Sequence, residues 1–271
     1  MTVQVALTIA GSDSGGGAGI QADLKTFQEL GVFGTSAITA VTAQNTHGVH
    51  GVYPIQTEGV IAQMRAVLDD FDVKACKTGM LFSAEIITEV ATLLKEYPSF
   101  PLVIDPVMIA KGGQTLLQQQ AIQALKEHLL PLATIVTPNI PEAEVLTGMK
   151  IRTDEDIQQA AAAFIQMGAK AVVMKGGHRN DVLDAKDYYA DEEGQSFTVT
   201  TPWIQTKDTH GTGCTFAAAL TSFLAKGYSL TDAVAEAKQF IQAAIENGLK
   251  IGSGHGPTNH WAYGDLKKEI H

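Results

Sequence analysis

The hydrophobic positions form short runs rich in Val, Ile and Leu, separated by longer stretches with apolar residues at helical spacing. The short runs, which we predict to be strands, are Val3–Ala10, Thr35–Thr42, Val73–Lys77, Leu102–Ile104, Thr134–Val136 and Ala171–Met174. The helical stretches between them are Gly19–Leu30, Glu58–Phe71, Ala84–Glu96, Gln118–Leu130 and Asp154–Met167. Runs without strict alternation are typical of strands buried on both faces, so this order predicts an α/β fold with a mainly parallel sheet.

Other features of the sequence predict a hairpin at the edge of the sheet and a single domain. Asp187–Ala190 and Ser196–Thr200 flank the turn Asp191–Gly194, which predicts an antiparallel hairpin at a sheet edge. We find no internal repeat and no Pro, Gly or Ser linker long enough to divide the chain. The sequence therefore predicts one domain over residues 1–271.

Composition and charge exclude several classes of protein. The chain has 29 acidic and 19 basic residues, a net charge of −10, which argues against a nucleic-acid partner. Its two cysteines, Cys76 and Cys214, are too few and too far apart for a disulfide scaffold or a zinc site. The N-terminus has no basic leader, and no run approaches about 18 consecutive apolar residues. We expect a cytoplasmic protein with free thiols that does not bind a membrane.

The first glycine-rich loop, Ala10–Gly19, joins the first strand to the first helix. It lies where ligands bind in open α/β sheets, and its glycines would let backbone amides approach a ligand. A flexible turn is the alternative. Gly17–Ala22 fits part of the dinucleotide fingerprint, but Gln44 and Asn45 stand where the acid for a ribose hydroxyl is required. A Walker-type motif is absent from the sequence, so the common nucleotide motifs are incomplete or missing.

Asp23 is an unexpected residue in the first predicted helix. It lies within an apolar stripe formed by Ile20, Leu24, Phe27 and Leu30. A carboxylate in such a stripe is costly unless a partner satisfies it. We therefore expect Asp23 to contact a ligand, the alternative being that it only complements the helix dipole.

The second glycine-rich loop, Asp208–Cys214, precedes a strongly helical pattern. Gly211, Thr212 and Gly213 would begin that helix, whose unpaired N–H groups form an anion site. Such fixed amides suit a phosphoryl group in transfer. Cys214 lies in the first turn, where we expect a lowered thiol pKa and a role as base or nucleophile. The alternative is a small residue that packs a tight turn.

Other polar residues fall at the ends of predicted strands. Asn139 and Glu142 follow one strand, and Glu142 could hold Mg²⁺ directly or through water, or could be only a helix N-terminal acid. Lys175 follows another strand and could reach a phosphate, although a solvated strand end is the alternative. Asp105 ends a third strand and is a second metal candidate. The eight histidines show no metal-ligand spacing.

Seven segments together resemble a known family: AGSDSGGGAGIQADLKTF, VTAQNTHGV, KTGML, VIDPVM, TPNIPEAE, MKGGH and THGTGC. The chain is similar over nearly its whole length to the bacterial hydroxymethylpyrimidine/phosphomethylpyrimidine kinases of thiamin synthesis. These are related to pyridoxine/pyridoxal kinases of the ribokinase-like superfamily. The resemblance implies a three-layer α/β/α fold and a homodimer. It also implies phosphorylation of a hydroxymethyl group, and of the resulting monophosphate, with ATP and Mg²⁺.

The resemblance also implies roles for particular residues. The pyrimidine site would be lined by Gly11, Asp23, Gln44, Met80 and Val107. ATP would be bound by Asn139, Glu142, Lys175, Gly213 and Lys238, and the metal would lie near Asp105 and Glu142. Gly211–Cys214 would form the anion hole. Cys214 stands where sugar kinases of the superfamily carry an aspartate base, so the identity of the base differs from theirs.

Three alternatives stay open beside a pyrimidine kinase. A pyridoxal or pyridoxine kinase differs only in substrate, and an NAD-dependent oxidoreductase is disfavoured by the missing ribose acid. A non-catalytic nucleotide- or vitamer-binding regulator is disfavoured by Asp105, Glu142, Lys175 and Cys214. Gln44 favours the pyrimidine, because its amide presents an acceptor beside a donor that matches an aminopyrimidine edge. Gln44 could instead only pin its own loop.

Overall fold

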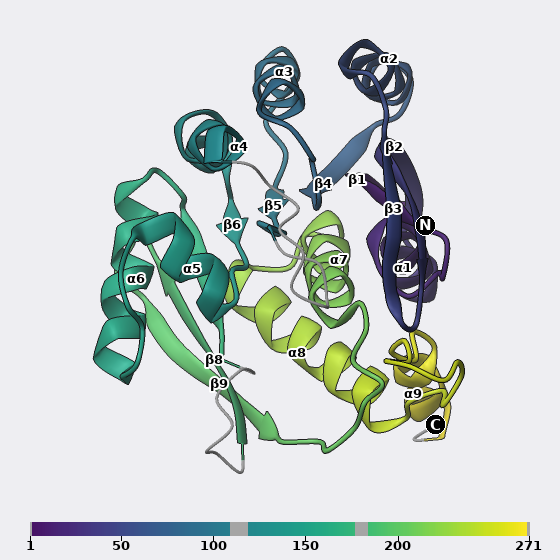
Figure 1. Cartoon of the computed structure of the whole chain (residues 1–271). Coiled ribbons are helices and arrows are strands. Elements are labelled where there is room, and N and C mark those ends of the chain that lie inside the picture. The colour runs from purple at the N-terminus through teal and green to yellow at the C-terminus, as the bar shows by residue number, and fades with distance from the viewer. Residues whose placement is uncertain (1, 109–118, 177–183, 270–271) are drawn as a thin grey trace.

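The computed structural model describes residues 2–108, 119–176 and 184–269, and within them forms one mixed sheet (Figure 1). The strand order is β3-β2-β1-β4-β5-β6-β7-β8-β9. The strands are β1 (Val5–Asp13), β2 (Phe33–Asn45), β3 (Gly48–Pro54), β4 (Val73–Thr78), β5 (Leu102–Ile104), β6 (Ile135–Val136), β7 (Ala171–Lys175), β8 (Asp184–Asp191) and β9 (Ser196–Pro202). The pairs from β2 to β7 are parallel, and β3, β8 and β9 add antiparallel edges.

The helices of the described residues follow the predicted order closely. They are α1 (Gly19–Glu29), α2 (Thr57–Leu68), α3 (Ala84–Leu94), α4 (Gln119–Ala124), α5 (Ile140–Thr147), α6 (Asp154–Gln166), α7 (Thr212–Ala225), α8 (Leu230–Glu246) and α9 (Ala262–Glu269). The helix predicted over Gln118–Leu130 is divided, because α4 passes into a π turn at Leu125–Leu129 and a 3-10 turn at Leu130–Leu132. Gln118, and the last two residues of the MKGGH motif, lie outside the described residues.

Two apolar clusters lie on opposite faces of the sheet and make the fold three-layered. Residues of β7 alternate between them, since Val172 and Met174 join the cluster under α2–α6. Ala171 and Val173 join the cluster under α1, α7, α8 and α9. Strands buried on both faces therefore separate two helical layers, and the predicted α/β/α fold is confirmed (Figure 1).

The antiparallel edges agree with prediction on one side of the sheet only. The predicted hairpin is confirmed, with β8 and β9 paired in a register that places Asp187 opposite Val199. On the other side β2 continues to Asn45 and returns as β3, a strand that the sequence analysis did not predict. Most positions of β3 are half-buried or exposed, so the strand carries no continuous apolar run.

The topology places the site at one edge of the sheet. The chain adds β2 on one side of β1 and then β4 on the other, so the direction of winding changes between β1 and β4. Ligands of open α/β sheets bind outside the carboxyl ends of the strands at such a point. The N-terminus of α7 lies near this edge, beside the loops that follow β1 and β4 (Figure 1).

Candidate active site

A cavity of about 640 Å³ opens at this edge of the sheet. All but one of the residues proposed for the site from the sequence line it. They are Gly11, Gln44, Met80, Asp105, Val107, Asn139, Glu142, Lys175, Gly211, Thr212, Gly213, Cys214 and Lys238. The structure thus brings the two glycine-rich loops and the ends of β2, β4, β5, β6 and β7 around a single space.

Asp23 is the exception, and the expectation that it contacts a ligand is corrected. Its side chain is fully buried, accepts a hydrogen bond of 2.6 Å from Thr8, and pairs with Lys77 at 2.8 and 2.9 Å. Burial pushes the pKa of Lys77 down, but the Asp23 carboxylate holds that pKa above its ordinary value. The acid in the apolar stripe is therefore satisfied by a buried lysine of β4, which the sequence analysis did not consider.

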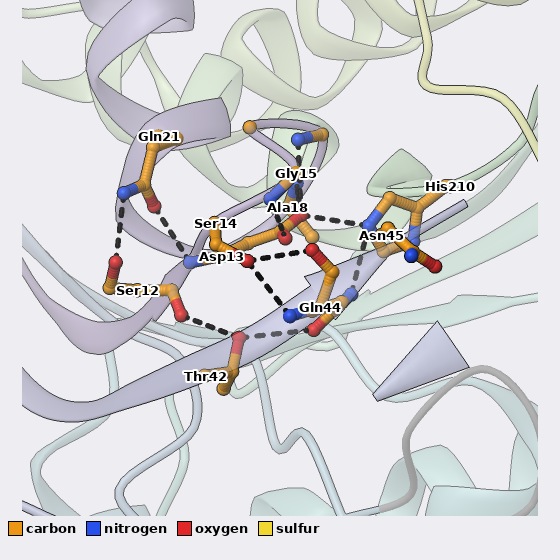
Figure 2. Close-up of polar contacts among 12 residues, drawn as sticks. Ser12, Asp13, Ser14, Gly15, Ala18, Gln21, Thr42, Gln44, Asn45 and His210 are labelled. Atoms are coloured by element: carbon orange, nitrogen blue, oxygen red, sulfur yellow. Dashed lines mark hydrogen bonds and ion pairs between the residues drawn. The ribbon is translucent and has the colours of Figure 1, made fainter. Parts of the chain in front are cut away.

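The first glycine-rich loop folds around Asp13, a residue that the sequence analysis missed (Figure 2). The Oδ1 atom of Asp13 accepts from the amide of Gly15 at 2.8 Å, and Oδ2 accepts from Gly17 at 3.0 Å and Ala18 at 2.8 Å. Burial opposes ionisation, but hydrogen bonds from His210 and from these amides hold the pKa of Asp13 below its ordinary value. The expectation that this loop offers its amides to a ligand is therefore wrong for those three amides.

His210 joins this loop to Gln44. Its Nε2 atom lies 2.8 Å from Oδ2 of Asp13 and 3.0 Å from the Gln44 carboxamide (Figure 2). The backbone of Gln44 is held separately by Ser14, whose hydroxyl accepts from the Gln44 amide and contacts the Gln44 carbonyl. The spacing of the histidines tests only for metal-ligand patterns, and contacts across such sequence separations leave no local signal.

The second glycine-rich loop presents a helix N-terminus to the cavity. Gly211 is the N-cap of α7 with φ of +81°, and a Cβ there would lie 1.7 Å from the Gly17 carbonyl oxygen. Among the described residues, no side chain caps α7. The Thr212 amide donates to the Thr209 carbonyl at 3.4 Å. The next first-turn N–H groups have no intrahelical acceptor, so Gly213 and Cys214 offer donors at the cavity wall. These donors lie where the sequence predicted an anion site.

Cys214 departs from the expected electrostatics. Burial raises the pKa of its thiol to about 12; Lys77 lowers it, while Asp23 and Asp105 raise it further. A hydrogen bond from the Gly19 amide also lowers the pKa but does not offset the burial. The expected lowered pKa is therefore wrong, and the thiol is protonated at neutral pH.

The two lysines proposed for ATP are both paired with acids. Lys175 lies 3.0 Å from Oδ1 of Asp105, and Lys238 lies 2.6 Å from Oδ2 of Asp187. A Cβ on Gly213 would be 3.3 Å from the Lys175 ammonium, so this cation lies directly beside the first turn of α7. The positive charge of Lys175 and the α7 amides are therefore available to the same anion.

Glu142 caps a helix and also faces the cavity. It forms a capping box with Asn139, in which each backbone amide donates to the other side chain at 2.8 Å. Burial raises the pKa of Glu142 to about 7; the Lys175 charge opposes this shift, and the Asp105 charge adds to it. Both acids line the cavity, and each carboxylate acts on a neighbour of the other through Lys175 or directly through its charge.

The two acids proposed for a metal, Asp105 and Glu142, suit one type of ion better than others. The described residues contain no group of three or more His, Cys, Asp or Glu that could hold a metal on its own. Mg²⁺ commonly binds through one or two carboxylates, with water and phosphate oxygens as its other ligands. Asp105 and Glu142 match that donor set.

No helix in the described part of the chain is long and apolar enough to cross a membrane.

The proteins that this chain resembles in sequence are kinases, which agrees with a cavity suited to phosphate. Residues 13–259 match the phosphomethylpyrimidine kinase family. The chain is 59% identical to the hydroxymethylpyrimidine/phosphomethylpyrimidine kinase of Haemophilus influenzae, covering 97% of this chain and 99% of that protein. It is 55% identical to the Bacillus subtilis protein of the same name, covering 97% of each.

Solved structures of kinases with similar sequences share the fold of this chain. The pyridoxal kinase of Bacillus subtilis in complex with ADP has a TM-score of 0.87 at 42% identity, covering 96% of this chain and 98% of that one. The phosphomethylpyrimidine kinase of Clostridium difficile has a TM-score of 0.79 at 45% identity, covering 90% and 100%. The chain therefore belongs to the phosphomethylpyrimidine kinase family.

Proposed function

We propose that this protein transfers phosphate from ATP to 4-amino-5-hydroxymethyl-2-methylpyrimidine and then to the resulting monophosphate, in thiamin biosynthesis. One observation carries the proposal. A single cavity is lined by Gln44, suited to a ring edge, and by the uncapped α7 N-terminus beside Lys175, suited to phosphate. The names of the relatives, which include a bifunctional thiamine biosynthesis protein of Geobacter sulfurreducens, support it.

The pyrimidine would lie between the β1, β2 and β4 ends of the cavity. Gln44 would bind the amino group and the adjacent ring nitrogen through its amide oxygen and nitrogen. Gly11 gives the ring space, because a Cβ there would lie 2.4 Å from the Met80 Cε atom. Val107 would complete the apolar wall. This placement directs the hydroxymethyl group toward the α7 end.

The phosphoryl group in transfer would lie at the first turn of α7. Charge spreads over its oxygens, and the amides of Gly211, Gly213 and Cys214 and the Lys175 ammonium would stabilise that charge. Asp105 and Glu142 would hold Mg²⁺, which when bound neutralises phosphate charge. Asn139 and Lys238 line the same cavity and would bind the remainder of ATP.

Cys214 is the proposed partner of the substrate hydroxyl. The protonated thiol would orient the hydroxyl by a hydrogen bond. Only its thiolate form would take up the hydroxyl proton, becoming the thiol as the new bond from oxygen to phosphorus forms. A thiolate at this position would be a strong base, since its pKa is raised to about 12, but it is scarce at neutral pH. Loose phosphoryl transfer needs little activation of the nucleophile, so late proton transfer is compatible with such a base.

A second candidate is phosphorylation of pyridoxal or pyridoxine. The specific observation that favours it is the likeness to solved pyridoxal kinases, including that of Staphylococcus aureus in complex with pyridoxal, with a TM-score of 0.89 at 40% identity. Pyridoxine lacks an amino group adjacent to a ring nitrogen beside its phosphorylated arm. Gln44 would be poorly satisfied against it, so we place this activity below the pyrimidine reaction.

Release of ADP tests the proposal. Purified protein is incubated with ATP and Mg²⁺ alone, with the pyrimidine alcohol, with its monophosphate, and with pyridoxine, and products are identified by mass spectrometry. We expect ADP release to depend on the pyrimidine alcohol and on its monophosphate. ADP release with pyridoxine only would favour the second candidate, and no release with any alcohol would remove the kinase proposal.

We also propose that the protein is a homodimer and acts in the cytoplasm. Both proposals agree with the family resemblance, and the location agrees with a reaction that uses ATP. Light scattering after size-exclusion chromatography measures the assembly directly, and a monomer mass would contradict it.

A further inference from the structure

Three segments far apart in the sequence meet at one histidine ring (Figure 2). His210 comes from the residue before the α7 N-cap, Asp13 from the end of β1, and Gln44 from the end of β2. A single ring atom, Nε2 of His210, lies 2.8 Å from Asp13 Oδ2 and 3.0 Å from the Gln44 carboxamide. We call these three side chains the His210 network.

The charge on Asp13 decides whether the Nε2 atom of His210 carries a proton. Asp13 is 3% exposed and accepts three backbone N–H bonds, and these bonds together with His210 hold its pKa below its ordinary value. Asp13 is therefore an anion, and a ring nitrogen 2.8 Å from an anion carries a proton. The tautomer is fixed by this partner, as is usual for a histidine held by a carboxylate.

The proton on Nε2 in turn decides which atom of the Gln44 side-chain carboxamide faces His210. In the structure the Gln44 Nε2 atom lies 3.0 Å from His210 Nε2, and the Gln44 Oε1 atom lies 3.3 Å from Thr42 Oγ1 (Figure 2). The oxygen and nitrogen of a carboxamide are nearly equal in shape, so the surrounding hydrogen bonds decide between this orientation and its flip. A protonated Nε2 would oppose the Gln44 NH₂ group and attract the Gln44 oxygen. With the oxygen toward His210, the NH₂ group faces Thr42 Oγ1 at 3.3 Å, and that hydroxyl donates its own proton to the Ser12 carbonyl at 2.8 Å. The flipped orientation gives an acceptor to the His210 Nε2 proton and to one Gln44 N–H, and leaves the second N–H without a partner in this network.

We propose that His210 is a positioning residue that sets substrate specificity by fixing the orientation of the Gln44 amide. The inference rests on the proposed function, because Gln44 is there the group that binds the pyrimidine. With the orientation fixed, Gln44 keeps one oxygen lone pair and one N–H for a ligand. An aminopyrimidine then binds in one sense only, its amino group donating to the oxygen and its ring nitrogen accepting from the N–H.

The network also explains why Asp13 binds its own loop. An isolated His210 could rotate or change tautomer and present Gln44 with either an acceptor or a donor. The Asp13 carboxylate, itself fixed by the amides of Gly15, Gly17 and Ala18, removes that freedom. A Cβ on Gly17 would lie 2.6 Å from the His210 Cδ2 atom, so the loop also packs directly against the ring. The glycine-rich loop thus acts on specificity through the histidine.

Two substitutions at His210 and one control test this role. His210→Phe keeps a ring but removes the donor, whereas His210→Gln keeps an N–H donor near the Nε2 position. His50→Phe is the control, since His50 is exposed, bonds only Asn45 among the described side chains, and does not line the cavity. The measured quantity is kcat/KM for the pyrimidine alcohol divided by that for pyridoxine, with pyrimidine affinity from calorimetry.

We expect His210→Phe to lower this ratio about tenfold, mostly through KM for the pyrimidine, with kcat changed less than about threefold. His210→Gln should restore the ratio to within about threefold of wild type, and His50→Phe should leave it unchanged. A Gln44→Met background makes the test specific. If His210 acts through Gln44, then adding His210→Phe to Gln44→Met lowers the ratio no further.

Three results would overturn the inference, and they are distinguishable. Wild-type protein that prefers the pyrimidine, together with an unchanged ratio in His210→Phe, removes the role of His210 and leaves the proposed function intact. Additive losses in the double variant also remove it. Wild-type protein that does not phosphorylate the pyrimidine alcohol removes both the inference and the proposed function.

Discussion

The two glycine-rich loops of this protein use their backbone amides in opposite ways. In the loop between β1 and α1, three amides donate to the Asp13 carboxylate. In the loop before α7, the acidic residue is Asp208, and its Oδ2 atom accepts instead from the amide of Lys250. The amides of Gly213 and Cys214 in the first turn of α7 therefore remain for an anion. Glycine content alone does not identify an anion site; the position of the nearest acid decides it.

The two loops are also packed against each other. Gly211 approaches the Gly17 carbonyl so closely that no side chain fits between them. His210 of the second loop bonds Asp13 of the first. The first loop is therefore a scaffold for the second. Substitutions at Gly211–Cys214 should affect chemistry, whereas those at His210 and in the first loop should affect specificity or stability.

The largest effect is expected at Cys214. Replacing Cys214 with Ala should lower kcat by roughly 10²–10⁴, the usual contribution of a positioned proton acceptor, with little change in KM. Cys76→Ala is the matched control, because that thiol is buried under the other helical layer and does not line the cavity. Steady-state kinetics measure both. A Cys214→Ala variant that keeps most of its kcat would show that the α7 amides and Lys175 suffice.

Alkylation of Cys214 tests the electrostatics of the second loop. Because burial raises the thiol pKa to about 12, the thiolate fraction at neutral pH should be roughly 10³ below that of an ordinary cysteine. The rate of reaction with iodoacetamide, followed by mass spectrometry, should rise about tenfold per pH unit through the alkaline range. A rate that levels off near pH 8 would mean that α7 lowers the pKa after all.

Gly211→Ala should disturb the anion site through the contact between the loops. The residue has φ of +81° and faces the Gly17 carbonyl oxygen, so the first turn of α7 must shift. Loss of one well-placed donor costs roughly 10²–10³ in kcat. Gly227→Ala is the control at the other end of α7, since its φ is +84° but nothing lies within 4 Å of its Cβ position. Equal losses in both variants would attribute the effect to backbone strain alone.

Asp13→Asn should give the smallest effect on chemistry and a clear effect on stability. The new NH₂ group would oppose one or more of the loop amides, costing about 1.5–3 kcal/mol in the free energy of unfolding. Asp13 has a lowered pKa, so its contribution is present above the ordinary value of 3.8 and is lost as pH falls through the folded pKa. Urea unfolding should therefore separate the two proteins near neutral pH and bring them together in strong acid. A constant difference across that range would contradict the ionic role of Asp13.

The layered fold could be predicted because its signals are local. Strands such as Ala171–Met174 are buried on both faces and give continuous apolar runs, and the turn Asp191–Gly194 marks the hairpin. β3 could not be predicted, since its positions are mostly half-buried or exposed and include Gly48 and Gly51. Partial burial removes the periodic signal on which the prediction depends.

The candidate site could be predicted where strand ends carry its residues. Asp105, Asn139 and Lys175 follow parallel strands, and parallel strands end at one edge of the sheet. Other features depend on contacts between distant positions. Neither the pairing of Asp23 with Lys77 nor that of Asp13 with His210 leaves a local pattern, and the pKa of Cys214 depends on how the surrounding layers bury it.

Direct competition between the two alcohols tests the central claim. Wild-type protein is given equal concentrations of the pyrimidine alcohol and pyridoxine with limiting ATP and Mg²⁺, and the two phosphorylated products are quantified by mass spectrometry before ATP is exhausted. We predict pyrimidine monophosphate in excess by about tenfold or more, the discrimination expected of a site built on a buried bidentate hydrogen bond. Equal products, or an excess of pyridoxine phosphate, would contradict the account.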